Sequence, residues 1–455
     1  MLWPRVFHNN KYLKLMVKYA CKIFWILAMV SIAESKGPNV VLIMADDLGY
    51  HDLSCYGHTS IKTPVIDRLA KEGVRLTSFY SGSTICTPSR MALLTGSYPS
   101  RLGWKRGVIG HIMKRGQGMS RDALTMAEIF KEQGYRTGIF GKWHLGDESE
   151  FLPHEQGFQE SFYINKSNNQ TKKLWRRDKI VKDPFDNRRL TEEFTNEAVS
   201  FIEANKDNPF FLYVPYSAPH FPVQAHPDWK GKSDYGSYGD VVEEMDSRIG
   251  EILHALKDGK IEKKTIVVFL SDNGPEPLTK ESKAEPLRGK KWSALEGGNR
   301  VPCIVRFPDK IPRGAENNEL IAAIDLLPTL SHACGIDLEG QAKGNHLIDG
   351  MNLWDHLTGQ GNSKESRQEF LYWHGSDGFQ AIRMGKWKLF LNRKDAGMKG
   401  EGPALFNLEE NITETVDVSK MFPERVRSMH ETAKKRLSSI EKNSIPLGNV
   451  PGNRK

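Results

Sequence analysis

Two pairs of oxygen-bearing side chains follow two apolar runs and could hold a cation together. Asp46 and Asp47 come directly after residues 39–45, and Asp272 and Asn273 come just after residues 265–270. These are hard donors, and the chain has no histidine or thiolate pair at zinc-like spacing, so the set suits Ca²⁺ or Mg²⁺. Either pair alone could equally be a turn, because Asp and Asn close to a glycine are common turn residues. Two pairs after two buried strands favour a metal site.

Cys86 lies in the second chemically interesting stretch, residues 81–96. Pro88 suits the first position of a helix and Gly96 its end, so we expect a short helix over residues 88–95. Cys86 would then lie at a helix N-terminus, where free backbone N–H groups attract an anion. Arg90 could point toward the same place. The alternative is an ordinary buried cysteine before a capped helix.

Cations and proton carriers form a third group: Lys142, His144, His220 and Lys291. Lysines hold the oxygens of a tetrahedral anion as point charges, and histidines move protons near neutral pH. Taken singly, each is better explained as an exposed lysine or as a histidine bonded to a backbone carbonyl.

The elements that must position these residues are apolar strands alternating with helices. Strands are expected at 39–45, 74–79, 136–140, 210–214 and 265–270, and helices at 63–73, 125–134 and 240–256. This pattern predicts an α/β fold, with a large, mostly parallel mixed sheet and helices on both faces. Polar motifs follow four of the strands, so we expect the site at the carboxyl edge of the sheet.

The C-terminal part has a different pattern. Residues 335–349 are rich in glycine and polar residues, and antiparallel strands are expected at 380–383, 387–391 and 404–406, with a helix at 424–442. We expect a catalytic domain over 36–340 and a smaller α+β subdomain over 341–455. The basic stretch 165–179 is interpreted as a solvated loop, with binding of a sulfated polymer as the alternative.

The N-terminus predicts export. Five basic residues precede the apolar run 23–30, and small residues follow it, which is typical of a cleaved signal peptide over residues 1–35. The run is short for a membrane span, so a signal anchor is the lesser alternative and no stable span is expected after cleavage. We therefore expect a secreted or periplasmic protein.

Charge and cysteine content exclude several classes. The formal net charge of +8 halves once residues 1–35 are removed, and no basic-aromatic pattern indicates nucleic-acid binding. Cys55, Cys303 and Cys334 allow at most one disulfide, so the chain is no disulfide scaffold.

The motif Cys86-Thr87-Pro88-Ser89-Arg90, followed by Leu94-Thr95-Gly96, resembles the signature of the type I sulfatases, formylglycine-dependent and arylsulfatase-like members of the alkaline-phosphatase-like superfamily. The motif Gly141–Gly146, the histidine His220 and Lys291, five residues before Glu296-Gly297-Gly298, also match. Lys290 stands next to Lys291 and leaves that assignment open by one residue.

The resemblance implies that Cys86 is oxidised to formylglycine (3-oxoalanine) by a formylglycine-generating or an anaerobic sulfatase-maturating enzyme. It implies one divalent cation, usually Ca²⁺ with Mg²⁺ as the alternative. The implied ligands are Asp46, Asp47, Asp272, Asn273 and formylglycine 86.

The implied reaction is hydrolysis of a sulfate ester to an alcohol and inorganic sulfate. The formylglycine hydrate is the implied nucleophile, and a sulfated covalent intermediate follows. Arg90 favours ionisation of the hydrate, His144 accepts a proton, and Lys142, His220 and Lys291 bind the substrate.

We expect a sulfated carbohydrate as the substrate, from the export signal and the mild basicity, with aryl sulfates as surrogates. The candidates for recognising its sugar are Trp104, His111, Lys114, Trp373 and His374.

Two alternatives remain. One is a phosphonate or phosphate diester hydrolase of the same superfamily, which comparative turnover of sulfate, phosphate and phosphonate esters separates. The other is a non-catalytic glycan-binding relative with unmodified Cys86, which the mass of the Cys86 peptide separates.

Overall fold

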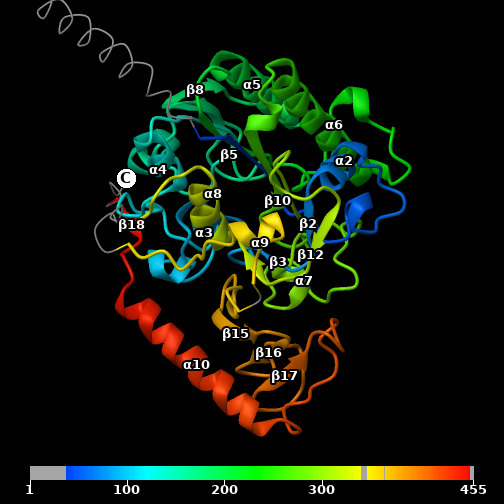
Figure 1. The fold of residues 1–455 in the computed structure, drawn as a ribbon, viewed down its shortest axis with the longest axis vertical. Helices are drawn as coiled ribbons and strands as arrows, with labels where there is room; N and C mark the ends of the chain where they lie inside the picture. Colours follow the sequence, from blue (N-terminus) through cyan, green and yellow to red (C-terminus); the bar gives the residue numbers. More distant parts are fainter. Residues whose placement is uncertain (1–36, 340–345, 363, 451–455) are drawn as a thin grey trace, which may run out of the picture. The chain divides into compact units, whose positions relative to one another are not determined.

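The computed structural model describes residues 37–339, 346–362 and 364–450, and the chain from Pro38 to Lys455 forms one compact unit (Figure 1). The predicted signal peptide over residues 1–35 lies outside the described residues. Within the described part, no helix is both long and apolar enough to cross a membrane. The predicted boundary between residues 340 and 341 stays a prediction.

A mixed ten-stranded sheet forms the centre, in the order β12-β2-β11-β10-β1-β9-β5-β6-β7-β8. Its middle is parallel: β1 (Asn39–Ala45) lies between β10 (Thr265–Ser271) and β9 (Phe210–Pro215), and β5 (Arg136–Lys142) pairs with β9 and β6 (Glu160–Ile164). The antiparallel pairs lie toward the two ends of the sheet and involve β2 (Val74–Leu76), β11 (Cys303–Arg306), β7 (Leu174–Arg176) and β8 (Lys179–Lys182). At one edge, β12 (Ala315–Asn317) pairs in parallel with β2. The predicted fold class is confirmed.

Both faces of this sheet are buried, because alternate side chains of each central strand enter different cores. In β1, Val40, Leu42 and Met44 belong to one hydrophobic cluster, and Val41 and Ile43 belong to the other. Such burial on both faces is why these strands are continuous apolar runs.

Helices cover the two faces in two groups. Apolar residues of α2 (Pro64–Glu72), α5 (Leu190–Asn205) and α6 (Gly236–Asp258) enter the core that contains Val41. Those of α3 (Cys86–Thr95), α4 (Met126–Glu132) and α8 (Leu326–Ala333) enter the other core. The remaining short elements are α7 (Glu296–Asn299), α9 (Trp354–Thr358), β3 (Phe79–Tyr80), β4 (Gln117–Gly118), β13 (Ile321–Ala322) and β18 (Gly448–Asn449), together with eight 3-10 turns in the described residues.

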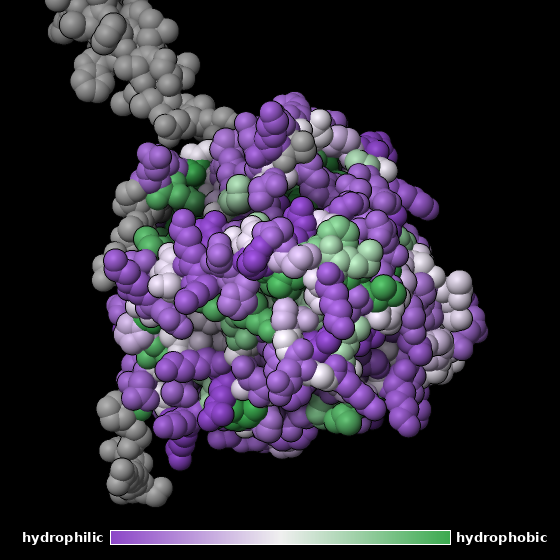
Figure 2. Space-filling view, turned by 90° about the horizontal axis from the view of Figure 1, so that it is seen from below, coloured by the Kyte–Doolittle hydropathy of each residue, from purple (hydrophilic) through white to green (hydrophobic). Residues whose placement is uncertain are grey.

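A second, antiparallel sheet completes the unit. It contains β14 (Glu369–His374), β15 (Gly378–Met384), β16 (Trp387–Phe390) and β17 (Ala404–Asn407), and α10 (Pro423–Lys442) runs along it (Figure 1). Apolar side chains of these strands, such as Leu371 and Leu389, join the core that also contains Val40. The face seen in Figure 2 is mostly hydrophilic, with hydrophobic residues in small groups.

Three local predictions differ from the structure. The structure has two short strands, β2 and β3, where one strand was expected over residues 74–79. The C-terminal sheet contains β14, which was not among the expected strands. Residues 165–179 are only partly a loop, because residues 174–176 form β7 and pair with β6. Strands at the edge of a sheet commonly carry charged residues, so the polar composition of this stretch is compatible with strand pairing. The four described cysteines are free thiols.

Candidate active site

The two oxygen-bearing pairs meet because β1 and β10 are parallel neighbours that end at the same level. Ala45 pairs with Ser271, so Asp46–Asp47 and Asp272–Asn273 leave the sheet side by side. The backbone N–H of Asp47 donates to Asp272 Oδ1 over 3.1 Å, and Asn273 Nδ2 donates to Asp47 Oδ1 over 2.7 Å. All four residues are at most 2 % exposed. The structure thus assembles the predicted cation ligands into one buried cluster.

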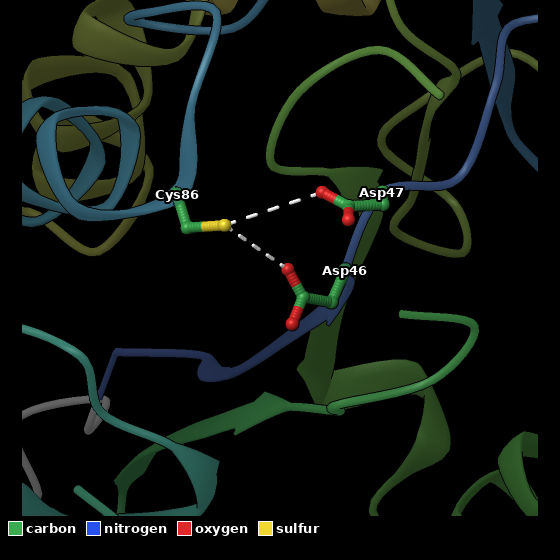
Figure 3. A group of neighbouring side chains, drawn as sticks. All are labelled: Asp46, Asp47 and Cys86. Carbon is green, nitrogen blue, oxygen red and sulfur yellow. Dashed lines mark hydrogen bonds between the residues drawn. The ribbon is translucent and has the colours of Figure 1, made fainter. Parts of the chain in front are cut away.

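Cys86 faces this cluster from the first turn of α3. Its Sγ lies 3.5 Å from Asp46 Oδ1 and 4.0 Å from Asp47 Oδ1, and it points between the two carboxylates (Figure 3). The helix begins at Cys86 itself, two residues earlier than Pro88 suggested, and ends at Gly96 with φ +66°. The ten residues of α3 are all buried, so the helix has no exposed polar face that would show its extent in the sequence.

Arg90 lies behind the carboxylates. Its Nε and Nη2 reach Asp272 Oδ2 at 3.2 and 2.8 Å, and its Nη1 donates to the carbonyl of Lys142 over 2.8 Å. Nη2 also lies 3.4 Å from Asp46 Oδ1. Arg90 therefore ties the helix that carries Cys86 to the ends of β10, β1 and β5.

Two lysines pair with the two aspartates after β1. Lys142 Nζ lies 2.6 Å from Asp46 Oδ2, and Lys291 Nζ lies 2.7 Å from Asp47 Oδ2. Lys290 instead directs its ammonium toward the carbonyls of Thr279 and Ser282, at 3.5 and 3.3 Å. The structure therefore places Lys291, and not its neighbour, in the site.

The two histidines have defined hydrogen-bond partners. His144 Nε2 lies 2.9 Å from the carbonyl of Ile109, which can only accept, so Nε2 carries the hydrogen; Nδ1 is buried without a partner. By the same argument, His220 Nδ1 donates to the carbonyl of Phe221 over 2.7 Å, and its Nε2 lies 3.5 Å from Asp47 Oδ2. Each ring therefore keeps one nitrogen that is not bonded to the backbone.

The backbone is strained at two of these residues. Asp47 has φ +66° and His144 has φ +59°, in the left-handed region that residues other than glycine rarely adopt. Such conformations cost roughly 1–3 kcal/mol each and concentrate at functional sites. The strain supports a functional reason for both side chains.

Charge crowding shifts the titration of the cluster. Burial acts to raise the pKa of Asp46, but Lys142, His220 and Arg90 hold it well below its ordinary value. Burial and then the charge of Asp46 raise the pKa of Asp272 to about 7, although Arg90 opposes them. Burial also raises the pKa of the Cys86 thiol, despite Lys142 and Lys291. Carboxylates this close compete for the available positive charge.

A divalent cation fits these residues. Ligand atoms of Asp46, Asp47 and Cys86 lie within 4.8 Å of one another, and Asn273 Oδ1 is buried without a hydrogen-bond partner. A cation would satisfy that oxygen and relieve the repulsion between the carboxylates.

Comparison with known proteins identifies the family. The sulfatase family model matches residues 38–336, which carry this whole cluster. The chain belongs to the sulfatase family. It is a sulfuric ester hydrolase of the type I group in the alkaline-phosphatase-like superfamily, as the sequence motifs indicated.

Individual relatives agree with this assignment. Human arylsulfatase A is 35% identical over 391 residues, which cover 78% of this sulfatase and 75% of the relative. An N-acetylgalactosamine-6-O-sulfatase of Bacteroides thetaiotaomicron is 30% identical over 486 residues, covering 88% and 93%. The crystal structure of Ps i-CgsB in complex with k-i-k-neocarrahexaose superposes with a TM-score of 0.78 at 30% identity, covering 91% and 95%.

A cleft of about 330 Å³ opens onto the cluster of this sulfatase. Cys86, His144, His220 and Lys291 line it, and so does His111, one of the predicted recognition residues. Ser167, Asn169 and Gln170 come from the stretch 165–179, for which binding of a sulfated polymer was the alternative interpretation. No sequence motif indicated the remaining lining residues: Val108, Gly110, Phe221, Glu276, Leu278 and Trp292. Glu276 Oε2 lies 3.2 Å from Lys291 Nζ, but in the sequence it is one acidic residue in a polar loop and carries no signal of its own.

The other recognition candidates do not line this cleft. Trp373 is 2 % exposed and packs against Tyr98 and Phe379 in the core, and His374 lies 3.1 Å from Asp377. Trp104 is buried and donates its indole N–H to the carbonyl of Gly107. Lys114 lies outside the cleft lining as well.

Proposed function

We propose that this sulfatase hydrolyses the sulfate ester of a sulfated carbohydrate, with formylglycine at position 86 as the nucleophile and one Ca²⁺ ion beside it. The observation that carries the proposal is the placement of Cys86, whose side chain faces two carboxylates and shares its cleft with His144, His220 and Lys291. Mg²⁺ is the alternative cation.

The cation and the modified residue would supply chemistry that the unmodified side chains lack. Asp46, Asp47, Asp272, Asn273 and formylglycine 86 would hold the cation, which adds positive charge at the sulfate oxygens, while the hydrated aldehyde offers a hydroxyl to attack sulfur.

The chain's own cations position the ester. Lys142 and Lys291 present ammonium groups beside the two aspartates, where they hold the oxygens of a tetrahedral sulfate and compensate its charge in the transition state. Arg90 donates to Asp272 and so holds residue 86 beside the strand ends. Removal of either lysine therefore weakens sulfate binding and slows turnover together.

The histidines act as proton carriers at stated atoms. His144 Nε2 is engaged by the carbonyl of Ile109, so Nδ1 is the atom that accepts a proton from a hydroxyl at position 86. His220 keeps its Nδ1–H on the carbonyl of Phe221, so Nε2 is the atom that relays a proton to the departing alcohol oxygen. Because Nε2 of the neutral ring holds no proton, that proton comes from the ammonium of Lys291 in the same cleft.

A carbohydrate substrate is supported by two relatives. One is named for N-acetylgalactosamine-6-O-sulfate hydrolysis, and another was crystallised with k-i-k-neocarrahexaose. The alternative of a phosphonate or phosphate diester hydrolase has less support, because the relatives compared above at 30% identity or more with a stated activity are sulfatases.

Biosynthesis would require one partner enzyme and an export signal. A formylglycine-generating or anaerobic sulfatase-maturating enzyme would oxidise Cys86, and a signal sequence within residues 1–35 would direct the chain to the periplasm or outside the cell. The mature protein would then meet its sulfated substrate there.

The test combines mass and turnover. Intact-mass analysis of the peptide that contains Cys86 is expected to show conversion of the thiol to an aldehyde in protein made with a maturating enzyme. That protein is expected to hydrolyse sulfated mono- or oligosaccharides and aryl sulfates, and Cys86→Ala is expected to lose at least a thousandfold in kcat. An unmodified thiol in inactive protein would favour the glycan-binding alternative. Faster turnover of phosphonates than of sulfate esters would favour the phosphonate or phosphate diester hydrolase.

A further inference from the structure

An indole forms one wall of the active-site cleft, and the reaction described above does not use it. Trp292 directly follows Lys291, and both line the cleft with Cys86 and His220. Trp292 is only partly buried. Trp104 and Trp143 donate their indole N–H groups to backbone carbonyls, whereas that of Trp292 has no hydrogen-bond partner among the described residues. It is therefore free to meet a ligand.

The backbone at Trp292 is held in a conformation that its side chain disfavours. Its φ is +77°, where a glycine would be unstrained. Its N–H donates to the carbonyl of Thr84 over 3.0 Å, and its carbonyl accepts from the N–H of Gly375 over 3.4 Å. Because the backbone alone would favour glycine here, the indole itself needs an explanation.

Two neighbours fix the ring in place. The rings of His111 and Trp292 stand perpendicular to each other, with centroids 6.0 Å apart and planes at 86°. Behind the indole lies Gly375, where a Cβ would come within 2.4 Å of the Trp292 Cε3 atom. The carbonyl of Gly375 also accepts from the N–H of Gly107 over 2.8 Å. The turn between β14 and β15 thus joins the loop that carries Trp292 to the loop that carries His111.

We propose that Trp292, flanked by His111 and seated on Gly375, is the platform for the sugar ring that bears the sulfate, and that it determines specificity for pyranosyl sulfates. The proposal rests on the proposed carbohydrate substrate. One face of a pyranose presents mainly C–H groups, which pack on a flat aromatic surface, and the indole N–H can donate to a ring hydroxyl. Lys291, next in the chain, places the sulfate at the edge of this platform.

The test compares two replacements of similar size that differ in flatness. Trp292→Phe keeps an aromatic face, and Trp292→Leu does not. With the sulfated monosaccharide that the native enzyme turns over fastest, Trp292→Leu is expected to raise KM about three- to tenfold with little change in kcat, and Trp292→Phe about twofold. Trp229→Leu, an indole outside the cleft, is the matched control and is expected to leave KM unchanged.

A second variant avoids changing the platform residue. Gly375→Ala introduces a methyl group that must displace the indole, so it is expected to raise KM for the same substrate while a sulfate-ion inhibition constant stays within twofold. This variant carries the test if Trp292→Leu does not fold, as judged by circular dichroism.

Three results separate the possibilities. Unchanged KM in both Trp292→Leu and Gly375→Ala would overturn the platform, and so would a fall in kcat as large as the rise in KM, because the indole would then serve only to place Lys291. If the native, formylglycine-containing enzyme hydrolyses aryl sulfates but no sulfated sugar, the carbohydrate proposal itself fails, and this inference fails with it.

Discussion

At the residue scale, the reactive side chains of the site come from elements that lie far apart in the sequence. Cys86 comes from the first turn of α3, the carboxylates follow β1 and β10, and Lys142 ends β5. Gly141 allows this convergence, because a Cβ there would lie 2.0 Å from the carbonyl oxygen of Pro215 at the end of β9. Close contact between strand ends is thus a condition for the site.

The carboxylate cluster predicts stabilisation by a cation. In chelator-treated protein, addition of Ca²⁺ at a hundred times its Kd is expected to stabilise the fold by about 3 kcal/mol, measured as a rise in the thermal unfolding midpoint. Asp47→Asn is expected to reduce this rise, because it removes a ligand charge. The exposed Asp228→Asn serves as control, and an equal rise in all three proteins would contradict the assigned site.

At the element scale, caps and contacts fix helices that propensity alone would leave uncertain. Thr125 and Glu128 form the predicted capping box at the start of α4: Thr125 Oγ1 accepts from the N–H of Glu128, and the Glu128 carboxylate accepts from the N–H of Thr125. Thr125 Oγ1 also donates to the carbonyl of Gln156 over 2.8 Å. The cap thereby joins the helix to the turn that precedes β6.

Thr125→Ala is expected to lower the free energy of unfolding by about 1–2 kcal/mol, because it leaves a helix N–H and a buried carbonyl without partners. The urea midpoint measures this. Thr125→Ser keeps the hydroxyl and is expected to retain most of the stability, so equal losses in both variants would assign the effect to the lost methyl group instead.

At the scale of the whole unit, buried charges join the small sheet to the catalytic core. Glu296, in α7, accepts hydrogen bonds from Tyr80, from Tyr372 over 2.9 Å and from Lys388 over 3.0 Å. Lys388 also lies 2.8 Å from Glu414. Burial acts to raise the pKa of Glu296, but Lys388 and two arginines lower it to about 2. The pKa of Glu414 is raised, and burial is the largest cause. Glu414 shares the Lys388 ammonium with Glu296, so that charge offsets burial only in part.

This network predicts an acid-dependent loss of stability. Because the pKa of Glu296 is lower in the folded chain than its ordinary 4.5, its contribution is complete above about pH 4.5 and is lost as the pH falls toward 2. The expected contribution is about 3 kcal/mol. The stability gap between the native protein and Glu296→Gln, measured by urea unfolding, is therefore expected to narrow across this range. A gap that stays constant with pH would contradict the assignment.

The periodic elements and the reaction could be predicted from the amino-acid sequence. Continuous apolar runs identified β1, β5, β9 and β10 because strands buried on both faces need apolar side chains throughout, and a signature around Cys86 indicated the reaction. Polar residues directly after those runs identified the carboxyl edge of the sheet as the place of the site. These are local properties, and local sequence is enough to encode them.

Which side chains meet in the site could not be predicted without the three-dimensional structure. Loops without a periodic sequence pattern determine three features of the site. They place Lys291 and not Lys290 beside Asp47, bring Glu276 into contact with Lys291, and put Trp292 in the cleft. The same holds for Trp373, which the sequence offered for recognition and the fold placed in the core. Such contacts join residues far apart in the chain, so their geometry follows from packing and not from neighbours in sequence.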